Sequence, residues 1–376
     1  VTVGVSATRS RRSGNLGTTF ASGSTTNDFA MPIEASWEVD VWGRIRRNVE
    51  SSEASAQGSA ADLEATRLSL QATLASDYFQ LRALDAQSRL FDETIAAFDR
   101  SLALTRSRKA YGIASQADVA QAETLLESTR AQAIDLALSR AQLEHAIAVL
   151  VGTPAGDFSL AAAPLDTTPP AIPVGLPSEL LERRPDVATA ERDAAAANAQ
   201  IGVAKAAYYP TITLSASGGF QSTDVTNWLT WPSRVWSLGP SVTETVFDGG
   251  KRGALTRQAR AAYDERVADY RKAVLAAFQN VEDELAALRL LDDELRRQTS
   301  AVAAARESVR LTIDRYKAGT VSYLDVVTTQ ETALADERTA VDILGRRMVA
   351  SVLLVEALGG GWSTEDLPSR AAVAVE

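Results

Sequence analysis

The chain has 376 residues, with 48 Asp and Glu against 38 Lys and Arg and a formal net charge of −10. Because phosphate binding needs clustered positive charge and no basic patch is present, the composition excludes a nucleic-acid surface. The chain has no cysteine and a single histidine, His145, which excludes disulfides, thiolate metal sites and any site that needs two histidines.

The first elements in the chain are two candidate strands, 1–8 and 29–42, which flank a loop rich in Ser, Thr and Gly. A second pair, 211–220 and 236–247, flanks a loop with two tryptophans. Segments of roughly ten residues that alternate in this way are typical of membrane β-barrel strands. Two hairpins cannot close a barrel, so either the chain oligomerises or the strands form a small soluble sheet.

Each strand pair is followed by about 65 residues without proline, 44–110 and 251–317, which predict two long helices. Each would run on the order of 100 Å and cannot bury its apolar stripe alone. Apolar residues recur at steps of seven, which requires coiled-coil packing against neighbouring helices. The heptad positions include Leu84, Phe91 and Phe98 in the first helix and Leu288, Leu295, Val302, Val309 and Tyr316 in the second.

Each long helix ends at a short turn with the same glycine, serine and aspartate. Gly112 and Gly319 can take the left-handed conformation that ends a helix. The pairs Ser115–Asp118 and Ser322–Asp325 match capping boxes that begin the next helix. The sequence therefore predicts helical hairpins, with returning helices at about 119–150 and 326–357.

An ungapped shift of 207 residues superimposes the two halves of the chain and indicates two structural copies of one unit. Between the copies, 152–184 is rich in proline and reads as an irregular connection with one short helix near 177–183. The matched pairs include Leu68/Leu275, Arg82/Arg289, Asp85/Asp292, Ser101/Ser308, Arg108/Arg315, Gly112/Gly319, Asp118/Asp325, Arg140/Arg347 and Gly152/Gly359.

No catalytic constellation can be assembled from these residues. The segment 247–253, FDGGKRG, lacks the spacing of a phosphate-binding loop and is better explained as a strand-to-helix bend. Asp118 and Asp325 are more simply helix caps than an acid–base pair, and His145 is more simply a packing or surface residue than a catalyst. We therefore expect no enzyme, no cofactor and no metal site.

The chain resembles a known family, the trimeric TolC-like outer-membrane efflux channels, and within it the lipoprotein group paired with proton-driven RND-type drug pumps. The resemblance covers nearly the whole chain to about Trp362. Its most specific stretches are 35–47 (ASWEVDVWGRIRR), 176–220, 246–255 (VFDGGKRGAL) and 316–326 (YKAGTVSYLDV).

This resemblance implies a mainly α fold with a small β part. Four strands per protomer would enter a trimeric twelve-stranded membrane β-barrel, and the long helical hairpins would form a periplasmic α-barrel wrapped by an equatorial belt. The implied parts are a first β-hairpin 1–42, a first tunnel repeat 43–151 with its tip near 110–118, a Pro-rich equatorial segment 152–184, an upper tunnel helix 185–208, a second β-hairpin 209–248, a second tunnel repeat 249–358 with its tip near 317–325, and an equatorial tail 359–376.

The same resemblance assigns roles at the two turns, which become the periplasmic tips. Asp325 matches an aspartate that makes an acidic constriction by threefold symmetry, Leu324 could form a hydrophobic ring beside it, and Tyr316 matches a tyrosine whose hydrogen bonds hold the closed tip together. Many relatives carry a second aspartate at the position of Thr328, so a double acidic ring is in doubt. The residues implied to contact the periplasmic adaptor are Gly112, Ile113, Gly319 and Thr320.

The functional hypothesis that follows is a passive exit duct in the outer membrane of a Gram-negative bacterium. Its implied partners are two further copies, a periplasmic adaptor, an inner-membrane RND-type pump and outer-membrane lipid. By comparison of its two halves, the sequence is expected to lack an upstream helix and whatever preceded it, including any export signal. The family resemblance implies a lipidated cysteine in that missing region. The alternative hypothesis is a soluble coiled-coil scaffold whose short sheets only cap helical hairpins.

Overall fold

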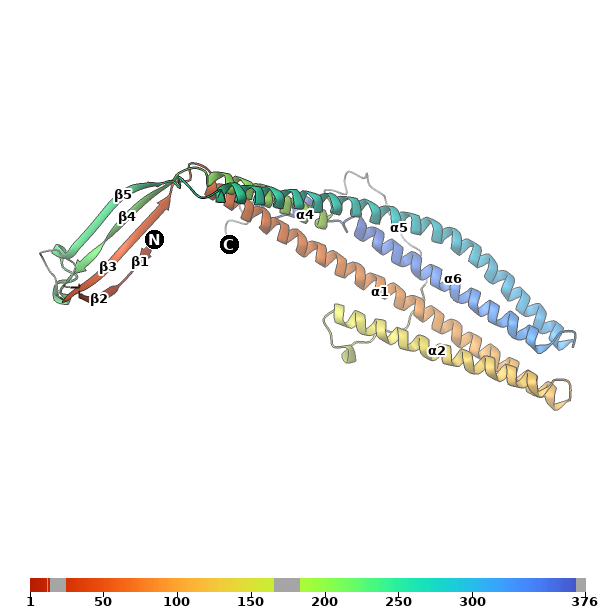
Figure 1. Ribbon diagram of the computed structural model, residues 1–376. Helices are drawn as coiled ribbons and strands as arrows, with labels where there is room; N and C mark the ends of the chain where they lie inside the picture. The colour runs from red at the N-terminus through yellow and green to blue at the C-terminus, as the bar shows by residue number, and fades with distance from the viewer. Residues whose placement is uncertain (12, 14–24, 166–182, 370–376) are drawn as a thin grey trace. The chain divides into compact units, whose positions relative to one another are not determined.

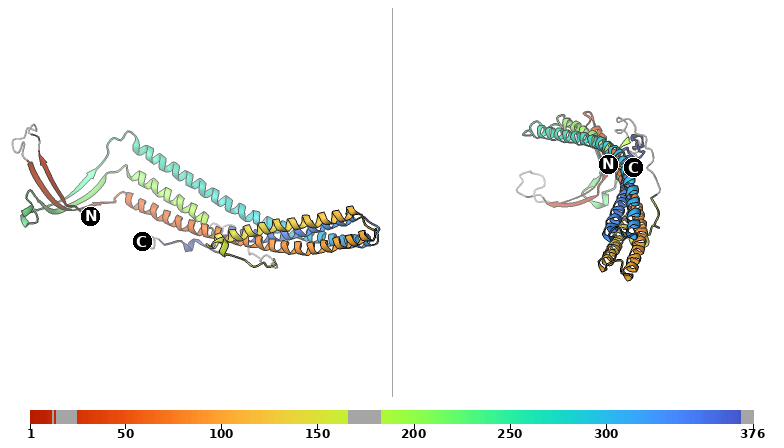
Figure 2. Two further views of the ribbon diagram at one scale, coloured as in Figure 1. Left: turned by 90° about the horizontal axis from the view of Figure 1, so that it is seen from below. Right: turned by 90° about the vertical axis from the view of Figure 1, so that its right-hand side faces the viewer.

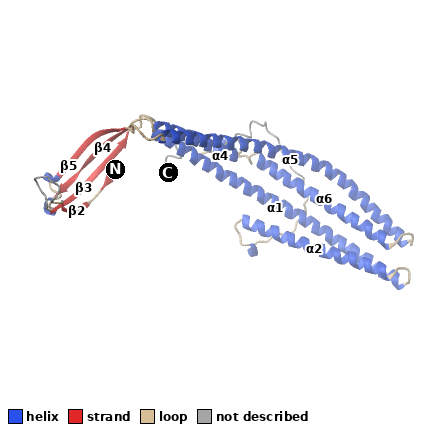
Figure 3. Ribbon diagram, in the orientation of Figure 1, coloured by secondary structure: helices blue, strands red, loops and turns tan. Residues whose placement is uncertain are grey.

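The computed structural model describes residues 1–11, 13, 25–165 and 183–369. These residues form two compact units, one from 1–56 and 191–268 and the other from 57–190 and 269–369. Figure 1 shows a sheet and long helices, and Figure 3 separates strand from helix by colour. The mainly α fold with a small β part is confirmed.

The sheet is antiparallel throughout, with the order β1-β3-β4-β5, and β2 also pairs with β3. Because β1 and β2 follow each other along the same side of β3, they act as one interrupted strand. Within the residues that the structure describes, one copy therefore provides four strand positions with two free edges, β1 with β2 on one side and β5 on the other. The strands are β1 (Thr2–Val3), β2 (Ser6–Arg11), β3 (Thr25–Glu38), β4 (Thr211–Ser222) and β5 (Arg234–Thr243).

Two of the predicted strands ran too far toward the helices. The first hairpin's second strand was expected to reach residue 42 but ends at Glu38, and β5 ends at Thr243 rather than at 247. The chain turns instead at two helix caps. The Asp40 carboxylate accepts hydrogen bonds from the N–H groups of Ile45 and Arg46, at 3.0 and 2.9 Å.

The turn between β5 and α5 (Lys251–Lys317) is also made by an aspartate that caps the helix. The Asp248 carboxylate accepts hydrogen bonds from the N–H groups of Gly250 and Arg252, both at 2.9 Å. Gly249 and Gly250 have φ angles of 62° and 89°, a region that favours glycine. The segment FDGGKRG is therefore a strand-to-helix bend, as predicted.

The two faces of the sheet differ in chemistry. Cross-strand neighbours share a face, and on one face these neighbours are mostly apolar: Trp37 with Leu214, Ala216 with Leu238, and Ile212 with Val242. On the other face Ser36 lies opposite Ser215, Glu34 opposite Ser217, and Thr213 opposite Ser241. The apolar side chains are uncovered, since Trp236 is 79% and Leu238 76% exposed.

The helices reproduce the predicted repeat. α1 (Arg44–Ala110) and α5 (Lys251–Lys317) each have 67 residues, and the returning helices α2 (Gln116–Leu150) and α6 (Tyr323–Ala357) each have 35. The returning helices begin three residues earlier than expected because the capping serine directly precedes them. Figure 2 shows the two hairpins from two further directions. The two-fold repeat of long helical hairpins is thereby confirmed.

The remaining helices are shorter. α4 (Pro185–Ala206) lies beside the start of α1, where the Ser51 hydroxyl donates to the Ala196 carbonyl at 3.1 Å and small side chains allow close approach. The short helix expected near 177–183 falls almost entirely outside the described residues. Single turns of 3-10 helix occupy Ala155–Asp157, Val225–Asn227, Trp231–Ser233 and Thr364–Asp366.

Small apolar clusters between the four hairpin helices hold the second unit together. Phe91 packs with Leu136 and Leu334, so that α1, α2 and α6 meet at one heptad position. Leu291 packs with Ile343 and Ala350 between α5 and α6. In the part of the chain that the structure describes, none of the helices combines the length and the apolar content that crossing a membrane requires.

Candidate functional site

The two hairpin tips have nearly the same backbone. Gly112 and Gly319 have φ angles of 73° and 77°, as expected for a left-handed helix end. The N–H of Ile113 donates to the Arg108 carbonyl at 2.9 Å, and the N–H of Thr320 donates to the Arg315 carbonyl at 3.0 Å. These bonds satisfy the last carbonyl groups of each long helix and close the turn.

The caps of the returning helices differ in detail. In the first tip the Asp118 N–H donates to the Ser115 hydroxyl at 3.1 Å, and the Ser115 N–H donates to the Asp118 carboxylate at 2.8 Å. In the second tip both the N–H and the hydroxyl of Ser322 donate to one oxygen of Asp325, at 2.9 and 2.7 Å. These hydrogen bonds lower the pKa of Asp325, with the Ser322 hydroxyl as the main cause. Asp325 therefore keeps its negative charge in mildly acidic solution.

Several of the predicted tip residues point to solvent. Ile113 is 64% exposed and Leu324 is 56% exposed, while Thr320 and Asp325 are also exposed. Tyr111 was not among the predicted tip residues; it is 80% exposed beside Gly112 and makes the first tip more apolar than the second. Its counterpart 207 residues later is an alanine, so only the comparison of the two turns could have marked it.

Tyr316 joins the two hairpins at the tip. It is 6% exposed, and its ring lies 5.4 Å from the ring of Tyr323 in an edge-to-face arrangement. The Arg108 guanidinium of the first hairpin lies 4.7 Å above the Tyr316 ring and donates to the Lys317 carbonyl at 3.0 Å. An arginine over an aromatic face is attracted to the ring electrons, so this contact holds α1 to the end of α5.

The expected hydrogen bonds of Tyr316 at a closed trimeric tip stay a prediction, because the structure holds one copy. This hydroxyl is buried and has no hydrogen-bond partner within the described residues. The hydroxyl that does bridge the hairpins belongs to Tyr323, 3.2 Å from the Ser101 hydroxyl. In a single copy, Tyr316 thus contributes through its ring, and Tyr323 and Arg108 are contacts that sequence reasoning did not identify.

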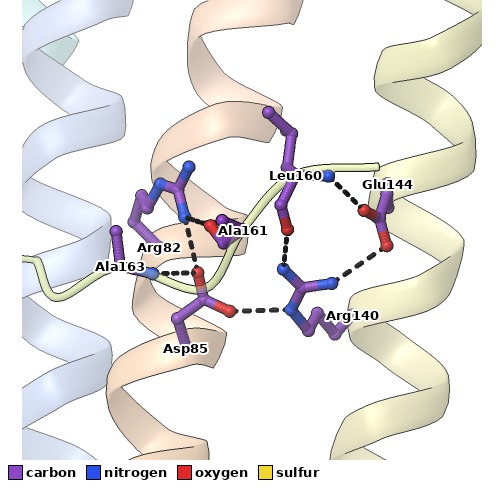
Figure 4. A network of polar contacts seen from close by, with 7 residues as sticks. All are labelled: Arg82, Asp85, Arg140, Glu144, Leu160, Ala161 and Ala163. Carbon is purple, nitrogen blue, oxygen red and sulfur yellow. Dashed lines mark hydrogen bonds and ion pairs between the residues drawn. The ribbon is translucent and has the colours of Figure 1, made fainter. Parts of the chain in front are cut away.

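A second polar site fixes the segment after α2 to the hairpin (Figure 4). The Asp85 carboxylate of α1 accepts hydrogen bonds from Arg82 and from Arg140 of α2, both at 2.7 Å. Arg140 also donates to Glu144 at 2.9 Å. We call these four residues, Arg82, Asp85, Arg140 and Glu144, the first clamp.

The first clamp holds the main chain of residues 160–163. Arg140 and Arg82 donate to the carbonyls of Leu160 and Ala161, at 2.6 and 2.7 Å. In return, the N–H groups of Leu160 and Ala163 donate to the carboxylates of Glu144 and Asp85, at 2.5 and 3.1 Å. All the atoms held are backbone atoms, so the first clamp fixes this main-chain segment whatever its side chains.

Other functional features are few. A groove of about 760 Å³ runs between the helices of the two hairpins and is lined by both apolar and polar side chains. Across residues 1–11, 13, 25–165 and 183–369, no three His, Cys, Asp or Glu side chains gather in a way that could hold a metal ion.

Comparisons with known proteins agree over nearly the whole chain. Residues 1–153 and 176–360 match the family model described as outer membrane efflux protein. The pyoverdine export outer membrane protein OpmQ of Pseudomonas aeruginosa is 36% identical over 363 residues, covering 94% of this chain and 75% of that protein. The probable efflux pump outer membrane protein TtgC of Pseudomonas putida is 32% identical over 360 residues, covering 95% and 74%.

Solved structures share the fold. The outer membrane protein VceC of Vibrio cholerae superimposes with a TM-score of 0.88 at 25% identity, covering 96% of this chain and 86% of that one. The likeness therefore extends across both units of the chain.

The first clamp generates a pH prediction. The pKa of Glu144 is lowered, mainly by the hydrogen bond from the Leu160 N–H. A carboxylate with a depressed folded pKa stabilises the fold above its unfolded pKa of about 4.3, and this contribution is lost as the pH falls through the folded value. We expect the hydrogen-exchange protection of the Leu160 amide to fall on acidification. Glu144→Gln should remove most of that pH dependence, and an unchanged profile in this variant would contradict the assignment.

Proposed function

This chain belongs to the outer membrane efflux protein family, and we propose that it forms the passive exit duct of a tripartite efflux system. It is an outer-membrane protein with a long periplasmic helical part. As a channel it performs no chemistry of its own, and small molecules delivered by an inner-membrane pump leave through it. The alternative of a soluble coiled-coil scaffold is not favoured by membership of this family.

The observation that carries this proposal is the amphipathic sheet with two free edges. An uncovered apolar face that carries Trp37, Trp236 and Leu238 suits contact with lipid, and the opposite face of serines and threonines suits a water-filled interior. Backbone groups at an edge must be paired inside a membrane, so a sheet of this kind has to close. Three copies of four strands would give a twelve-stranded barrel.

The packing of the helical hairpins is consistent with a tunnel that continues from the proposed barrel. Their heptad packing joins helices side by side, and continued around three copies it would enclose a conduit. Both turns would then lie at the far end of the tunnel, with Gly112, Ile113, Gly319 and Thr320 exposed for contact with a periplasmic adaptor.

The gate in this proposal lies at the second tip. Three copies of Asp325 around a narrow opening would attract cations and repel one another, and the exposed Leu324 beside each would narrow the pore further. Opening would require the second hairpin to move away from the first. The Arg108–Tyr316 contact resists that movement, and the pump and adaptor would have to overcome it.

The face assignment predicts that a substitution by arginine destabilises the barrel at one position of β5 and is tolerated at another nearby. Leu238→Arg places a charge on the apolar face. Near the membrane centre this charge should destabilise the folded barrel by about 2–4 kcal/mol. Ser241→Arg, on the polar face, should fold as well as the parent. Urea titration of folding into lipid vesicles measures both. Equal losses in the two variants would contradict the assignment.

The gate assignment predicts a change in ion block. Asp325→Asn keeps an oxygen that can cap α6 but removes the charge, so block by multivalent cations in planar bilayers should weaken at least about tenfold, or about 1.4 kcal/mol. Asp118→Asn makes the same change in the other cap and is the matched control. Unchanged block in Asp325→Asn would remove Asp325 from the constriction.

A further inference from the structure

The charged side chains of strands β1 to β5 are sorted by sign between the two faces of the sheet. Because successive side chains of a strand point to opposite faces, the strand register assigns each one to a face. Arg234 lies opposite Phe220, in line with Met31, and Arg9 and Arg11 fall on the same face of β2. This is the apolar face. The polar face has the carboxylates of these strands, Asp28, Glu34 and Glu38.

All three arginines lie toward the end of the sheet that is farther from the helices. The chain passes from β3 into α1 after Glu38 and from β5 into α5 after Thr243, so the start of β5 and the end of β2 lie at the opposite end, which we call the loop end. The long helical part is periplasmic, so in the proposed barrel the loop end lies in the outer leaflet. We call Arg9, Arg11 and Arg234 the basic border.

Arginines at the helix end of the sheet are paired within the chain. The Arg44 guanidinium lies 2.6 Å from the carboxylate of Glu38, and that of Arg252 lies 2.8 Å from the carboxylate of Asp248. Across residues 1–11, 13, 25–165 and 183–369, by contrast, the basic border forms no ion pair. Its positive charges are therefore available for anions from outside the chain.

Carboxylates near the loop end are held by neutral donors. Asp28 lies on the polar face and accepts hydrogen bonds from the Gln221 side chain, at 3.0 and 3.1 Å. Asp224, in the connection between β4 and β5, accepts hydrogen bonds from the N–H and the hydroxyl of Thr226, both at 2.9 Å. Neither carboxylate neutralises the basic border in the part of the chain that the structure describes.

An aromatic ring holds one guanidinium at the loop end. The Cζ atom of Arg234 lies 4.1 Å from the centre of the Trp231 ring, and Trp231 precedes β5 in the chain. Arginine side chains extend in this way from an apolar surface toward a lipid headgroup region. Trp231 is 72% exposed, and tryptophan is enriched at the same membrane depth. The pair is therefore suited to a lipid headgroup with negative charge.

We propose that the basic border binds the phosphate groups of the phosphorylated glycolipid of the outer leaflet. The inference rests on the proposed barrel. Guanidinium groups form short, charge-assisted hydrogen bonds with phosphate oxygens, often two to one phosphate. Closure would place β5 of one copy beside β2 of the next, on adjacent strands about 5 Å apart. Arg234 would then join Arg9 and Arg11 of its neighbour, so that each junction between copies completes one site.

Native mass spectrometry of the protein in non-ionic detergent tests this site. Titration with bisphosphorylated lipid A should give bound lipid, and lipid A without its phosphates should bind at least about tenfold more weakly. The triple variant Arg9→Gln, Arg11→Gln and Arg234→Gln should lose at least as much affinity, because each arginine at a charged lipid surface contributes about fivefold. The matched control changes the same number of exposed arginines of α5 and should bind as the parent does: Arg257→Gln, Arg260→Gln and Arg271→Gln.

Three results would overturn the proposal. The first is equal binding of the two lipids to the parent, and the second is undiminished binding to the triple variant. The third is displacement of the lipid by inorganic phosphate at equal concentration, which would show a site for any anion. Arg234→Gln alone should weaken binding about fivefold and gives the same decision if the triple variant does not assemble.

The same spectra, with bilayer conductance, separate this inference from the proposed function. If the parent forms conducting trimers but binds the two forms of lipid A equally, the basic border is not a lipid site and the channel function stands. If the parent forms no trimer, the proposed function fails as well.

Discussion

Unpaired main-chain hydrogen bonds at the two edges of the sheet are the constraint on which the rest of this protein depends. In one copy, β1 with β2 and β5 each leave a row of N–H and C=O groups without strand partners. Each such group costs several kcal/mol in the interior of a membrane, where water cannot take the place of a strand. Closure by further copies removes this cost, and the uncovered apolar face then meets lipid. In the proposed channel, oligomerisation would therefore be a condition of folding in the membrane.

Duplication gave the chain two similar hairpins, and their differences indicate a division of work. The first tip carries exposed Tyr111 and Ile113, which suits an apolar contact with a partner. The second has Asp325, whose carboxylate caps α6 and keeps its charge because Ser322 donates two hydrogen bonds to it. The arginine–aspartate pair between long and returning helices is retained in both copies, but only the first copy folds its own following segment over it. The two copies therefore share the hairpin and the ion pair but differ in the side chains at the tip and in the segment held after the returning helix.

The sequence predicted the long helices to the residue, because 44–110 and 251–317 lack proline and end at a glycine followed by a capping serine. It overextended β3, because Val39, Val41 and Trp42 continue the apolar alternation while the Asp40 cap, which ends the strand, depends on three-dimensional contact. The first clamp was not foreseen for a related reason. Its arginines and aspartate stand out in the sequence as repeated pairs. Their partners, however, are backbone atoms about 80 positions after Arg82, and no sequence period predicts that this segment packs against Arg82. Likewise, the family resemblance predicted a role for Tyr316, but the contact of its ring with Arg108 depends on the three-dimensional packing of the two hairpins and could not be predicted from it.

Disulfide trapping across the sheet edges tests ring closure most directly. One cysteine is introduced in β2, at Ser6 or Thr8, and one in β5, at Ser237 or Ser241. The chain has no native cysteine that could compete. Oxidation of the double variants in outer membranes should give, for at least one pairing, a covalent ladder that ends at three copies, because each edge meets the opposite edge of a neighbour. Disulfides that form only within one chain, or a ladder that continues past three, would contradict a closed trimer of four-stranded sheets.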